Sequence, residues 1–304
     1  MFGAISSLCL FCAIAAGSVA DDSVFLMSYF RTADESLYMA YSFDGCDWTA
    51  FNDEKPLLRA EIGNKSVRDP FIRRGLDGAF YFVCTNSWKS SMILAARSKD
   101  LIHWEEQRLL PVMEGVKTVH NCWAPEFFYD DKEGSFLIYW SSVTEENNHQ
   151  RIWSCRTKDF KTISPPRMLF DPGYTVIDAT IEFFNGAYYM IYKDERGENK
   201  HGTDNKAMRL AVSGNLDGPY QPQGGLITPH LTEGPALFRA GGKWLLFYDC
   251  FMDDRWGAEE SDDLQNWTNA DAKVKFPPQP RHGSVFTVTR KQFEALRDWY
   301  NLKN

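Results

Sequence analysis

The stretch SFDGCDW at residues 42–48 decides the fold, because the same short pattern returns four more times along the chain. Close copies read SKDLIHW at 98–104 and SDDLQNW at 261–267, and weaker copies read TKDFKTI at 157–163 and SGNLDGPY at 213–220. In this pattern an Asp can cap the backbone N–H groups of a tight turn, and a Trp can cover it. The copies follow one another at intervals of roughly 50 residues, the length of a four-stranded propeller blade.

A second motif repeats with the same step, as a short strand that begins with a polar residue. Its copies are RDPFI (68–72), APEFF (124–128), IDATIEF (177–183), EGPALF (233–238) and HGSVFTV (282–288). After four of them a glycine turn leads into an aromatic strand, and each unit then has room for two more strands before the next copy. The sequence therefore predicts five units of four antiparallel strands.

The first and last units are incomplete in complementary ways. The unit at 24–58 lacks an entering strand, whereas the strand at 282–288 has no outer strands after it. If the two share one blade, the ring closes and no open sheet edge remains. We therefore expect an all-β, five-bladed β-propeller that is closed by pairing of the C-terminal strand with the N-terminal blade. Residues 21–304 form one domain, with a short helix over 290–301.

The first twenty residues differ from the rest. Residues 8–16 are apolar and uncharged, and small residues stand at Ser18 and Ala20, the two positions that a signal peptidase reads. This pattern predicts a signal peptide over 1–20 and a secreted protein. The apolar run is short for a membrane span and no other stretch qualifies, so we expect no membrane segment.

Composition excludes some classes of function. The 304 residues carry a net charge of −8 and no basic run, so nucleic-acid binding is not expected. Aromatic residues make up 15% of the chain, which suits both an all-β core and stacking on sugar rings. Without the first twenty residues, the cysteines lack the close spacing of a zinc site, and the sequence leaves open one disulfide or buried thiols. They are Cys46, Cys84, Cys122, Cys155 and Cys250.

Polar residues recur where the inner strands begin. In a propeller these strands line the central axis and run the same way, so equivalent positions form a ring at one end. By spacing, the ring consists of Asp69, Glu126, Asp178, Glu233 and His282. Buried carboxyls must be paired, hydrated, metal-bound or protonated, and such clusters usually mark functional sites. The alternative, that these residues only cap strand ends, stays open.

The loops between the second and third strands of the blades lie on this same face. They span 30–36, 85–91, 142–150, 193–206 and 250–256, and they carry Arg31, Trp88, Lys193, Asp194 and Trp256. We therefore expect a polar bowl with an aromatic rim above a ring of carboxylates.

The whole arrangement resembles glycoside hydrolase family 43, whose members are five-bladed propellers that act mainly on glycans containing arabinose and xylose. The resemblance rests on five motifs in order: VRDP at 67–70, WAPE at 123–126, IDATI at 177–181, EGP at 233–235 and RHG at 281–283. There are two departures. A whole extra hairpin precedes Asp69, and Glu126 stands where that family often has Asp.

The resemblance implies roles for these residues. Asp69 matches the general base, Asp178 the aspartate that tunes and orients the acid, and Glu233 the general acid. His282 matches an axial histidine that in some members helps to hold a metal ion, so Ca²⁺ or Na⁺ near His282 is one expectation, although no cofactor is required. Further contacts to the substrate are expected from Arg68, Trp88, Trp123, Glu126 and His282.

The implied activity is hydrolysis of O-glycosidic bonds in an oligo- or polysaccharide by a monomeric, inverting enzyme. Inversion needs an acid and a base roughly 6.5–9.5 Å apart, with water between them. We expect the charge on Asp178 to raise the pKa of Glu233 and keep it protonated, while Asp69 stays ionised, helped by Arg68 if that side chain turns inward.

The sugar is left open by the sequence. The resemblance makes α-L-arabinofuranosides the first expectation, with β-xylosides and galactofuranosides as alternatives. A propeller that binds carbohydrate without cleaving it is the alternative of another class. Its repeats should be nearly identical, whereas these five repeats differ most at the axis.

Overall fold

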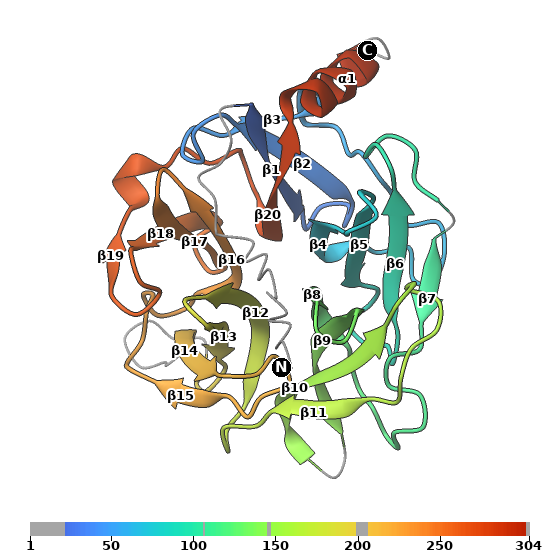
Figure 1. Cartoon of the computed structure of the whole chain (residues 1–304), viewed down its shortest axis with the longest axis vertical. Coiled ribbons are helices and arrows are strands. Elements are labelled where there is room, and N and C mark those ends of the chain that lie inside the picture. Colours follow the sequence, from blue (N-terminus) through green and yellow to red (C-terminus); the bar gives the residue numbers. More distant parts are fainter. Residues whose placement is uncertain (1–21, 106, 145–146, 199–205, 302–304) are drawn as a thin grey trace, which may run out of the picture.

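The computed structural model describes residues 22–105, 107–144, 147–198 and 206–301. It contains five four-stranded antiparallel sheets, arranged as blades around a central axis (Figure 1). The predicted all-β, five-bladed propeller is thereby confirmed. The predicted signal peptide lies outside the described residues and stays a prediction.

The first blade joins sequence from both ends of the described chain. Its strand order is β20 (Arg281–Thr289), β1 (Ser23–Phe30), β2 (Leu37–Ser42) and β3 (Thr49–Ala50). The hydroxyls of Ser28 on β1 and Ser284 on β20 lie 2.8 Å apart, and Ser28 also donates to the carbonyl of Pro70 in the next blade at 2.8 Å. The predicted closure of the ring by the C-terminal strand is therefore confirmed.

The other four blades are continuous in sequence and begin with the inner strand. The second contains β4 (Arg68–Arg74), β5 (Phe80–Thr85), β6 (Ile93–Ser98) and β7 (Arg108–Leu110). The third contains β8 (Trp123–Asp130), β9 (Ser135–Thr144), β10 (Asn147–Thr157) and β11 (Arg167–Phe170). The fourth contains β12 (Val176–Phe184), β13 (Ala187–Asp194), β14 (Ala207–Ser213) and β15 (Gln221–Gln223). The fifth contains β16 (Glu233–Ala240), β17 (Lys243–Cys250), β18 (Arg255–Ser261) and β19 (Trp267–Asn269).

The Asp turns have the structural role that their sequence predicts. Asp44 accepts hydrogen bonds from the backbone N–H groups two and three residues further on, and Trp48 donates its indole N–H to the turn at 3.1 Å. Asp100, Asp159 and Asp263 accept the same pair of bonds in their own blades. These bonds satisfy the donors that a tight turn leaves open.

Aromatic side chains fill the space between adjacent blades. Phe71 of the second blade and Phe127 of the third pack edge to face with ring centroids 5.1 Å apart.

Two expectations about loops are corrected by this packing and by the strand pairing. Trp256 is 4% exposed and packs against Phe276 in the core, so it does not belong to the rim. β9 and β10 also extend as paired strands into 142–150, where we expected a loop.

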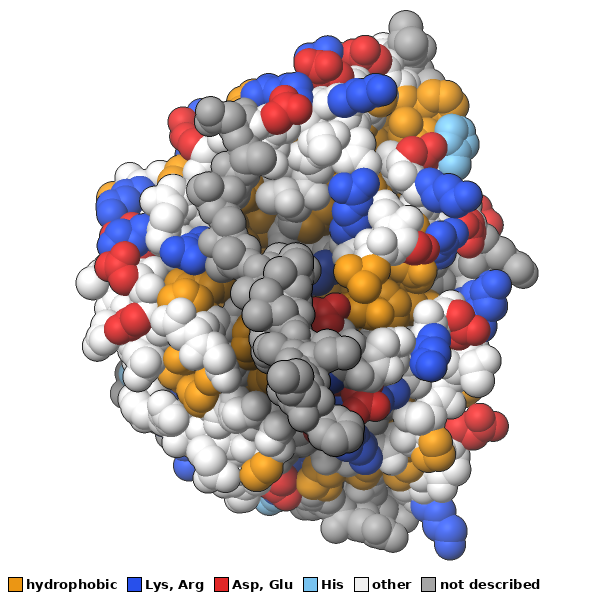
Figure 2. Space-filling model, viewed as in Figure 1, with side chains coloured by type: hydrophobic (Ala, Val, Ile, Leu, Met, Phe, Trp, Pro, Cys, Tyr) orange, Lys and Arg blue, Asp and Glu red, His pale blue; other side chains and the backbone are white. Residues whose placement is uncertain are grey.

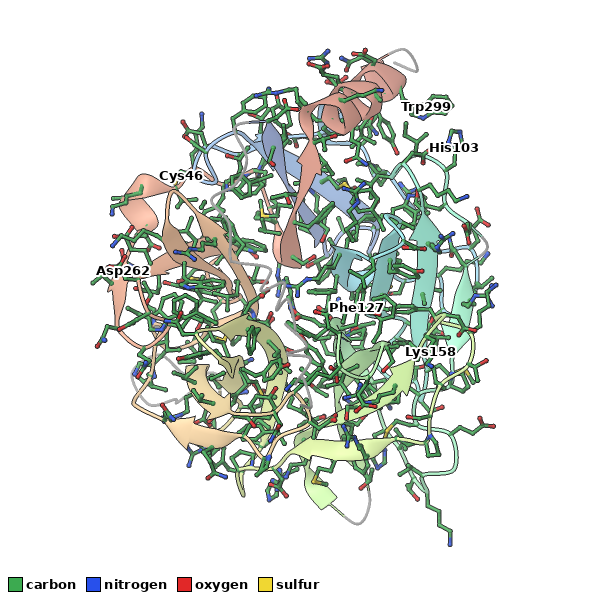
Figure 3. The ribbon with its side chains drawn as sticks, viewed as in Figure 1. Cys46, His103, Phe127, Lys158, Asp262 and Trp299 are labelled. Carbon is green, nitrogen blue, oxygen red and sulfur yellow. The ribbon has the colours of Figure 1, made fainter. Side chains whose placement is uncertain are left out.

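Helix α1 (Arg290–Asn301) follows β20 directly, as predicted. It packs against the first blade through Phe293, whose ring centroid lies 4.8 Å from that of Tyr41. Figure 3 shows Trp299 of α1 beside His103 of the second blade, with centroids 5.0 Å apart. Two short 3-10 helices are η1 (Asn52–Glu54) and η2 (Asp271–Lys273). Within the described ranges, no helix is both long and apolar enough to cross a membrane.

The cysteines and the surface charge bear on two further expectations. All five described cysteines are free thiols, and burial raises the pKa of Cys122 and Cys155 to about 12. The structure therefore favours buried thiols over a disulfide. On the face shown in Figure 2, the described acidic and basic side chains are interspersed around the molecule.

Candidate active site

Every inner strand carries one extra residue near its start. In β4 the pairing with β5 shifts between Arg68 and Phe71, and matching shifts occur in β8, β12, β16 and β20. Such a bulge lets two consecutive side chains face the same way, which regular alternation forbids. In four blades the second bulge residue has a positive φ: Asp69 (50°), Ala124 (46°), Asp178 (52°) and Gly234 (63°). For a non-glycine residue this conformation costs about 1 kcal/mol and is typical of functional sites.

The bulges surround a cavity of about 440 Å³ where the inner strands begin. The first bulge residues of the five blades all line it: Arg68, Trp123, Ile177, Glu233 and Arg281. Three second bulge residues line it too, namely Asp69, Asp178 and His282. Further lining residues are Thr32, Thr85, Trp88, Lys193, Glu195, Lys206 and Phe251. All the site residues expected from the sequence, except Glu126, therefore meet in one cavity, and the bulge explains how Arg68 and Asp69 both face it.

The ring inferred from spacing is wrong in its register. The counterpart of Asp69 in the third blade is Ala124, two residues before Glu126, and its counterpart in the fifth blade is Gly234, one residue after Glu233. Glu126 lies one layer deeper in the channel, is 4% exposed and accepts a hydrogen bond from Tyr139 at 2.8 Å. Burial raises its pKa to about 7. Glu126 is thus not among the residues that line the cavity.

Asp69 and His282 form an ion pair at the axis. Nδ1 of His282 lies 3.4 Å from Oδ1 of Asp69 and 3.9 Å from Oδ2 of Asp178. Burial opposes ionisation of Asp69, but the hydrogen bond and charge of His282, the charge of Arg68 and a 2.6 Å bond from Thr85 lower its pKa to about 2. Burial also opposes the His282 cation, yet the two aspartates raise its pKa to about 9. Asp69 is therefore an anion at neutral pH.

The proton of the site belongs to Asp178 rather than to Glu233. Burial raises the pKa of Asp178 to about 7, with His282 opposing and the charge of Glu233 adding to the rise. Glu233 is also buried, but Lys193 and Arg281 hold its pKa below the usual value. We expected Asp178 to keep Glu233 protonated. That expectation is wrong for the free protein, because two cations from other strands outweigh one carboxylate.

On the second strand of a blade, the residue that pairs with the first bulge residue also contacts the next blade. In the second and third blades this residue, which faces the first bulge residue, carries a hydroxyl: Thr85 on β5 and Ser141 on β9. The backbone N–H of Ala124 donates to Thr85 at 2.8 Å, and that of Asp178 donates to Ser141 at 3.0 Å. Neighbouring bulges are therefore fixed relative to one another.

In the fourth and fifth blades the same position is charged. Lys193 on β13 lies 2.9 Å from Oε2 of Glu233, and Asp249 on β17 binds Arg281 of the next inner strand. Arg281 also lies 3.2 Å from Oε1 of Glu233. Lys193 and Arg281 were not assigned as site residues from the sequence. Arg281 stands beside His282 in a motif, which was the available signal, whereas the contact of Lys193 follows only from strand register.

The rim of the cavity carries the expected aromatic residues. Trp88 and Trp123 meet edge to face with ring centroids 5.5 Å apart, and the indole N–H of Trp123 donates to the carbonyl of Trp88 at 3.0 Å. The guanidinium of Arg68 lies 4.5 Å from the Trp88 ring and is paired with Glu35 at 2.8 Å. Trp88 remains 58% exposed. An exposed ring held in a fixed orientation is suited to stacking on a sugar.

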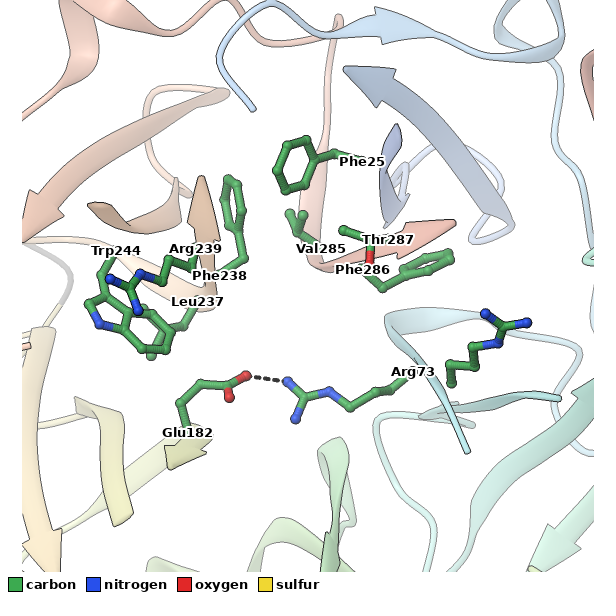
Figure 4. Close-up of a pocket in the computed structure, with 11 residues that line it drawn as sticks. Phe25, Arg73, Glu182, Leu237, Phe238, Arg239, Trp244, Val285, Phe286 and Thr287 are labelled. Carbon is green, nitrogen blue, oxygen red and sulfur yellow. Dashed lines mark hydrogen bonds and ion pairs between the residues drawn. The ribbon is translucent and has the colours of Figure 1, made fainter. Parts of the chain in front are cut away.

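The opposite end of the axis has a different character. A cavity of about 340 Å³ lies there, lined by residues near the ends of the inner strands (Figure 4). Glu182 of β12 is the acid among its described lining residues, and it is joined to Arg73 of β4 across the channel. Among the described residues that line this cavity, the one carboxyl is therefore held in an ion pair.

His282 is the residue that the resemblance connects with a metal ion. Its Nδ1 faces two carboxylates and its pKa is raised to about 9, whereas a metal ligand is a neutral imidazole. Among the residues that the structure describes, no group of three or more His, Cys, Asp or Glu side chains is arranged to hold a metal ion. These side chains do not by themselves fit a metal site, so the expected Ca²⁺ or Na⁺ stays a prediction and no step below involves it.

Comparison with known proteins agrees with this geometry. The model of a glycosyl hydrolase 43-related family, described as "Probable glycosyl hydrolase domain", matches residues 21–294. An alpha-L-arabinofuranosidase of Bifidobacterium longum subsp. longum is 24% identical over 179 residues. This match covers 48% of the present chain and 17% of the relative, so the chain spans only a small part of that protein's length.

Solved structures share the fold. A thermostable family-43 glycoside hydrolase is 19% identical with a TM-score of 0.59, over 77% of this chain and 83% of the other. An endo-1,4-beta-xylanase from Bacteroides thetaiotaomicron VPI-5482 is 17% identical with a TM-score of 0.59, over 87% and 94% of the two chains. At these identities the likeness shows the fold alone, whereas the family model matches almost the whole described chain. The resemblance inferred from the five motifs is thereby confirmed, and the chain belongs to the glycosyl hydrolase 43-related family of glycosidases.

Proposed function

We propose that this protein hydrolyses O-glycosidic bonds by direct attack of water, with inversion at the anomeric carbon, and that α-L-arabinofuranosides are its preferred substrates. The observation that carries the proposal is the meeting of Asp69, Asp178 and Glu233 in one cavity. Hydrolysis needs a carboxylate that activates water and a carboxylic acid that protonates the leaving oxygen. The cavity offers an ionised aspartate and a carboxyl pair that holds a proton.

The protonation pattern supports a division of roles. Asp69, with its pKa lowered to about 2, is the base that activates water. The proton for the leaving group is held in the free protein by Asp178, whose pKa is raised to about 7 and whose titration is linked to that of the neighbouring Glu233. Glu233 has the more exposed side chain of the two, 25% against 8%, so it is the member that protonates the leaving oxygen. In the free protein Asp178 holds the proton that Glu233 lacks.

The balance of charge in the cavity supports an uncharged sugar. Arg68 is paired with Glu35, Lys206 with Glu195, and Arg281 with Asp249. Lys193 and His282 are likewise paired with acids of the site. A uronic acid would have to break one of these pairs to gain a cation, whereas a neutral furanose or pyranose only needs hydrogen bonds and an aromatic surface.

The preference for arabinofuranose rests on the relative named above, an alpha-L-arabinofuranosidase. β-Xylosides and galactofuranosides fit the same charge balance, so they are the competing outcomes of the substrate test. A panel of p-nitrophenyl glycosides of these three sugars ranks them directly. Measurable glycan binding without release of p-nitrophenol from any of them would favour a carbohydrate-binding propeller instead.

The roles are tested on whichever glycoside is cleaved fastest. Asp69→Asn and Glu233→Gln each remove a proton-transfer group, so kcat should fall by at least about 100-fold. Asp262→Asn makes the same chemical change at an exposed carboxylate outside the cavity and should keep wild-type kcat. The anomer that forms first, followed by ¹H NMR, tests inversion. Retained activity in either site variant, or a product of retained configuration, would reject the mechanism.

Export is the second part of the proposal and rests on residues 1–20, with their apolar run and small residues at Ser18 and Ala20. A secreted protein should begin at Asp21 when it is recovered from the medium of expressing cells, which N-terminal sequencing can establish. Size-exclusion chromatography with light scattering tests the expected monomer.

A further inference from the structure

Lys193 is a buried lysine whose ammonium group lies inside the cavity wall. Its side chain is 2% exposed, and Nζ lies 2.7 Å from Oε2 of Glu195 and 2.9 Å from Oε2 of Glu233. The ring of Phe251 lies 4.6 Å from Nζ and covers it. A buried charge is expensive unless it is paired and hydrogen-bonded. This lysine therefore stays ionised, with its charge directed at the carboxyl of Glu233.

The carboxyl of Glu233 accepts hydrogen bonds from side chains of two other blades. Lys193 of the fourth blade holds Oε2, and Arg281 on β20 holds Oε1 at 3.2 Å. Arg281 is itself anchored by Asp249 and by a 3.2 Å bond to Thr32. The blade positions that correspond to Lys193 carry only hydroxyls in β5 and β9, so the ammonium group distinguishes the wall next to Glu233.

We propose that Lys193 is a positioning residue for the hydrolysis proposed above: it fixes the carboxyl of Glu233 between the fourth and fifth blades and governs when that carboxyl takes up its proton. A cation at hydrogen-bonding distance favours the ionised carboxylate. Glu195 competes for the same ammonium group, and Lys206 in turn binds Glu195 at 2.7 Å. The chain of ion pairs Lys206–Glu195–Lys193–Glu233 therefore sets how strongly the ammonium group of Lys193 stabilises the ionised carboxylate of Glu233.

Other charged groups of the site face the same carboxyl and remain in place in every variant below. They are Asp178 on β12, Asp249 on β17, and Arg281 and His282 on β20. Since they are common to wild type and variants, a change in pH dependence reports the lysine chain alone.

The main test replaces Lys193 with methionine, which has a similar length and no charge. Loss of the hydrogen bond from Lys193 should lower kcat by about 10- to 100-fold with a smaller change in KM. The reason is that the orientation of the Glu233 carboxyl is lost, whereas binding of the sugar is kept. Loss of the cation should raise the pKa of Glu233, so the alkaline limb of kcat/KM should move up by at least about 1 pH unit. Lys193→Arg, which keeps the charge, should restore the wild-type limb.

Two further variants separate positioning from mere stability. Lys206→Met removes a neighbouring buried cation that binds Glu195 but not Glu233, so the alkaline limb should move in the same direction as in Lys193→Met but by a clearly smaller amount. Glu195→Gln frees Lys193 from its second partner, so the limb should move to lower pH, opposite to Lys193→Met. If Lys193→Met and Lys206→Met shift the limb equally, or if Glu195→Gln leaves it unchanged, the proposal is wrong.

A readout without substrate keeps this inference separate from the proposed function. The carboxyl of Glu233 can be titrated by ¹³C NMR in the intact protein, with assignment through Glu233→Gln. Its midpoint should rise in Lys193→Met and fall in Glu195→Gln. A wild-type protein that cleaves no glycoside but shows these two shifts would reject the hydrolase and keep the coupling. Unchanged midpoints in an active enzyme would reject the coupling and keep the hydrolase.

Discussion

Gly234 approaches His282 so closely that a Cβ atom on Gly234 would lie 2.5 Å from Cγ of the imidazole. The same glycine has a φ of 63° and donates its N–H to Oδ2 of Asp178 at 3.1 Å. One backbone position therefore determines both where the imidazole lies and how Asp178 is oriented. An alanine there would have to displace His282, which is paired with Asp69.

The first prediction follows from this contact. Gly234→Ala should lower kcat/KM on the best glycoside by about 10- to 100-fold, because small displacements of catalytic groups have effects of this size. Gly224→Ala is the matched control, since Gly224 has a φ of 65° and no heavy atom within 4 Å of a built Cβ. It should cost about 1 kcal/mol of stability and leave activity intact. Equal activity in the two variants would contradict the assigned role of the contact.

The second prediction concerns the pH dependence of stability. The pKa of Asp178 is raised from 3.8 to about 7, so the folded protein binds this proton more tightly than the unfolded chain does. The resulting stability is complete below pH 3.8 and is lost as pH rises through 7. Asp178→Asn should therefore have a higher Tm than the wild type at pH 8, by at least about 2 °C, and this advantage should shrink toward pH 4.

Thermal unfolding at several pH values between 4 and 8 measures this difference. Asp262→Asn serves as the control, because the Asp262 side chain is 75% exposed. Its difference from the wild type should not vary with pH. A pH-independent difference in Asp178→Asn as well would show that Asp178 is not the proton carrier.

The third prediction concerns closure of the ring. A Cβ atom on Gly283 would lie 1.8 Å from the backbone oxygen of Ser28, at the bulge between β20 and β1. Gly283→Ala should destabilise the protein by about 1–3 kcal/mol or more, seen as a lower Tm. Gly225→Ala, where a built Cβ meets nothing within 4 Å, should unfold like the wild type. A wild-type Tm for Gly283→Ala would mean that the closing strand tolerates displacement at this point.

The fourth prediction concerns the rim. Trp88→Ala removes an exposed ring from the mouth of the cavity without touching the carboxyls, so KM should rise about tenfold while kcat changes little. Phe183→Ala removes a ring that is 48% exposed near the far end of β12 and should leave both constants unchanged. Steady-state kinetics on the best glycoside decide the matter. An unchanged KM in Trp88→Ala would place the sugar elsewhere.

The blades could be predicted from the sequence because their signals are local. The Ser-x-Asp turn satisfies its own backbone donors, so it keeps its identity wherever it occurs, as at Asp44 and Asp263. The closing strand was recognised because residues 282–288 have no outer strands after them. These features depend on neighbours in the chain, which the sequence displays directly.

The register at the axis could not be predicted from spacing, because the polar residue of each motif does not stand at the same position relative to the bulge. Counting residues aligned Glu126 and Glu233 with Asp69, although Ala124 and Gly234 are its counterparts. A usable signal was present: proline follows the second bulge residue in three blades, at Pro70, Pro125 and Pro235. Aligning the motifs on that proline gives the observed register.

The protonation of the acid pair could not be predicted for a different reason. The sequence indicated Asp178 as a neighbour of Glu233, but Lys193 reaches Glu233 from a different strand and a different blade. A pKa reflects all charges around a group. Recognising only Asp178 from the motifs therefore gave the wrong direction for the pKa shift of Glu233.

Strand β20 finishes both the ring and the site, because it pairs with β1 and also carries Arg281 and His282. During translation, a nascent chain that has not yet released residues 281–289 can form outer hairpins but has neither the imidazolium beside Asp69 nor the second grip on Glu233. The ring and the cavity are therefore completed in one step, when β20 pairs with β1, and a fragment that ends before this strand would have both an open sheet edge and an incomplete cavity.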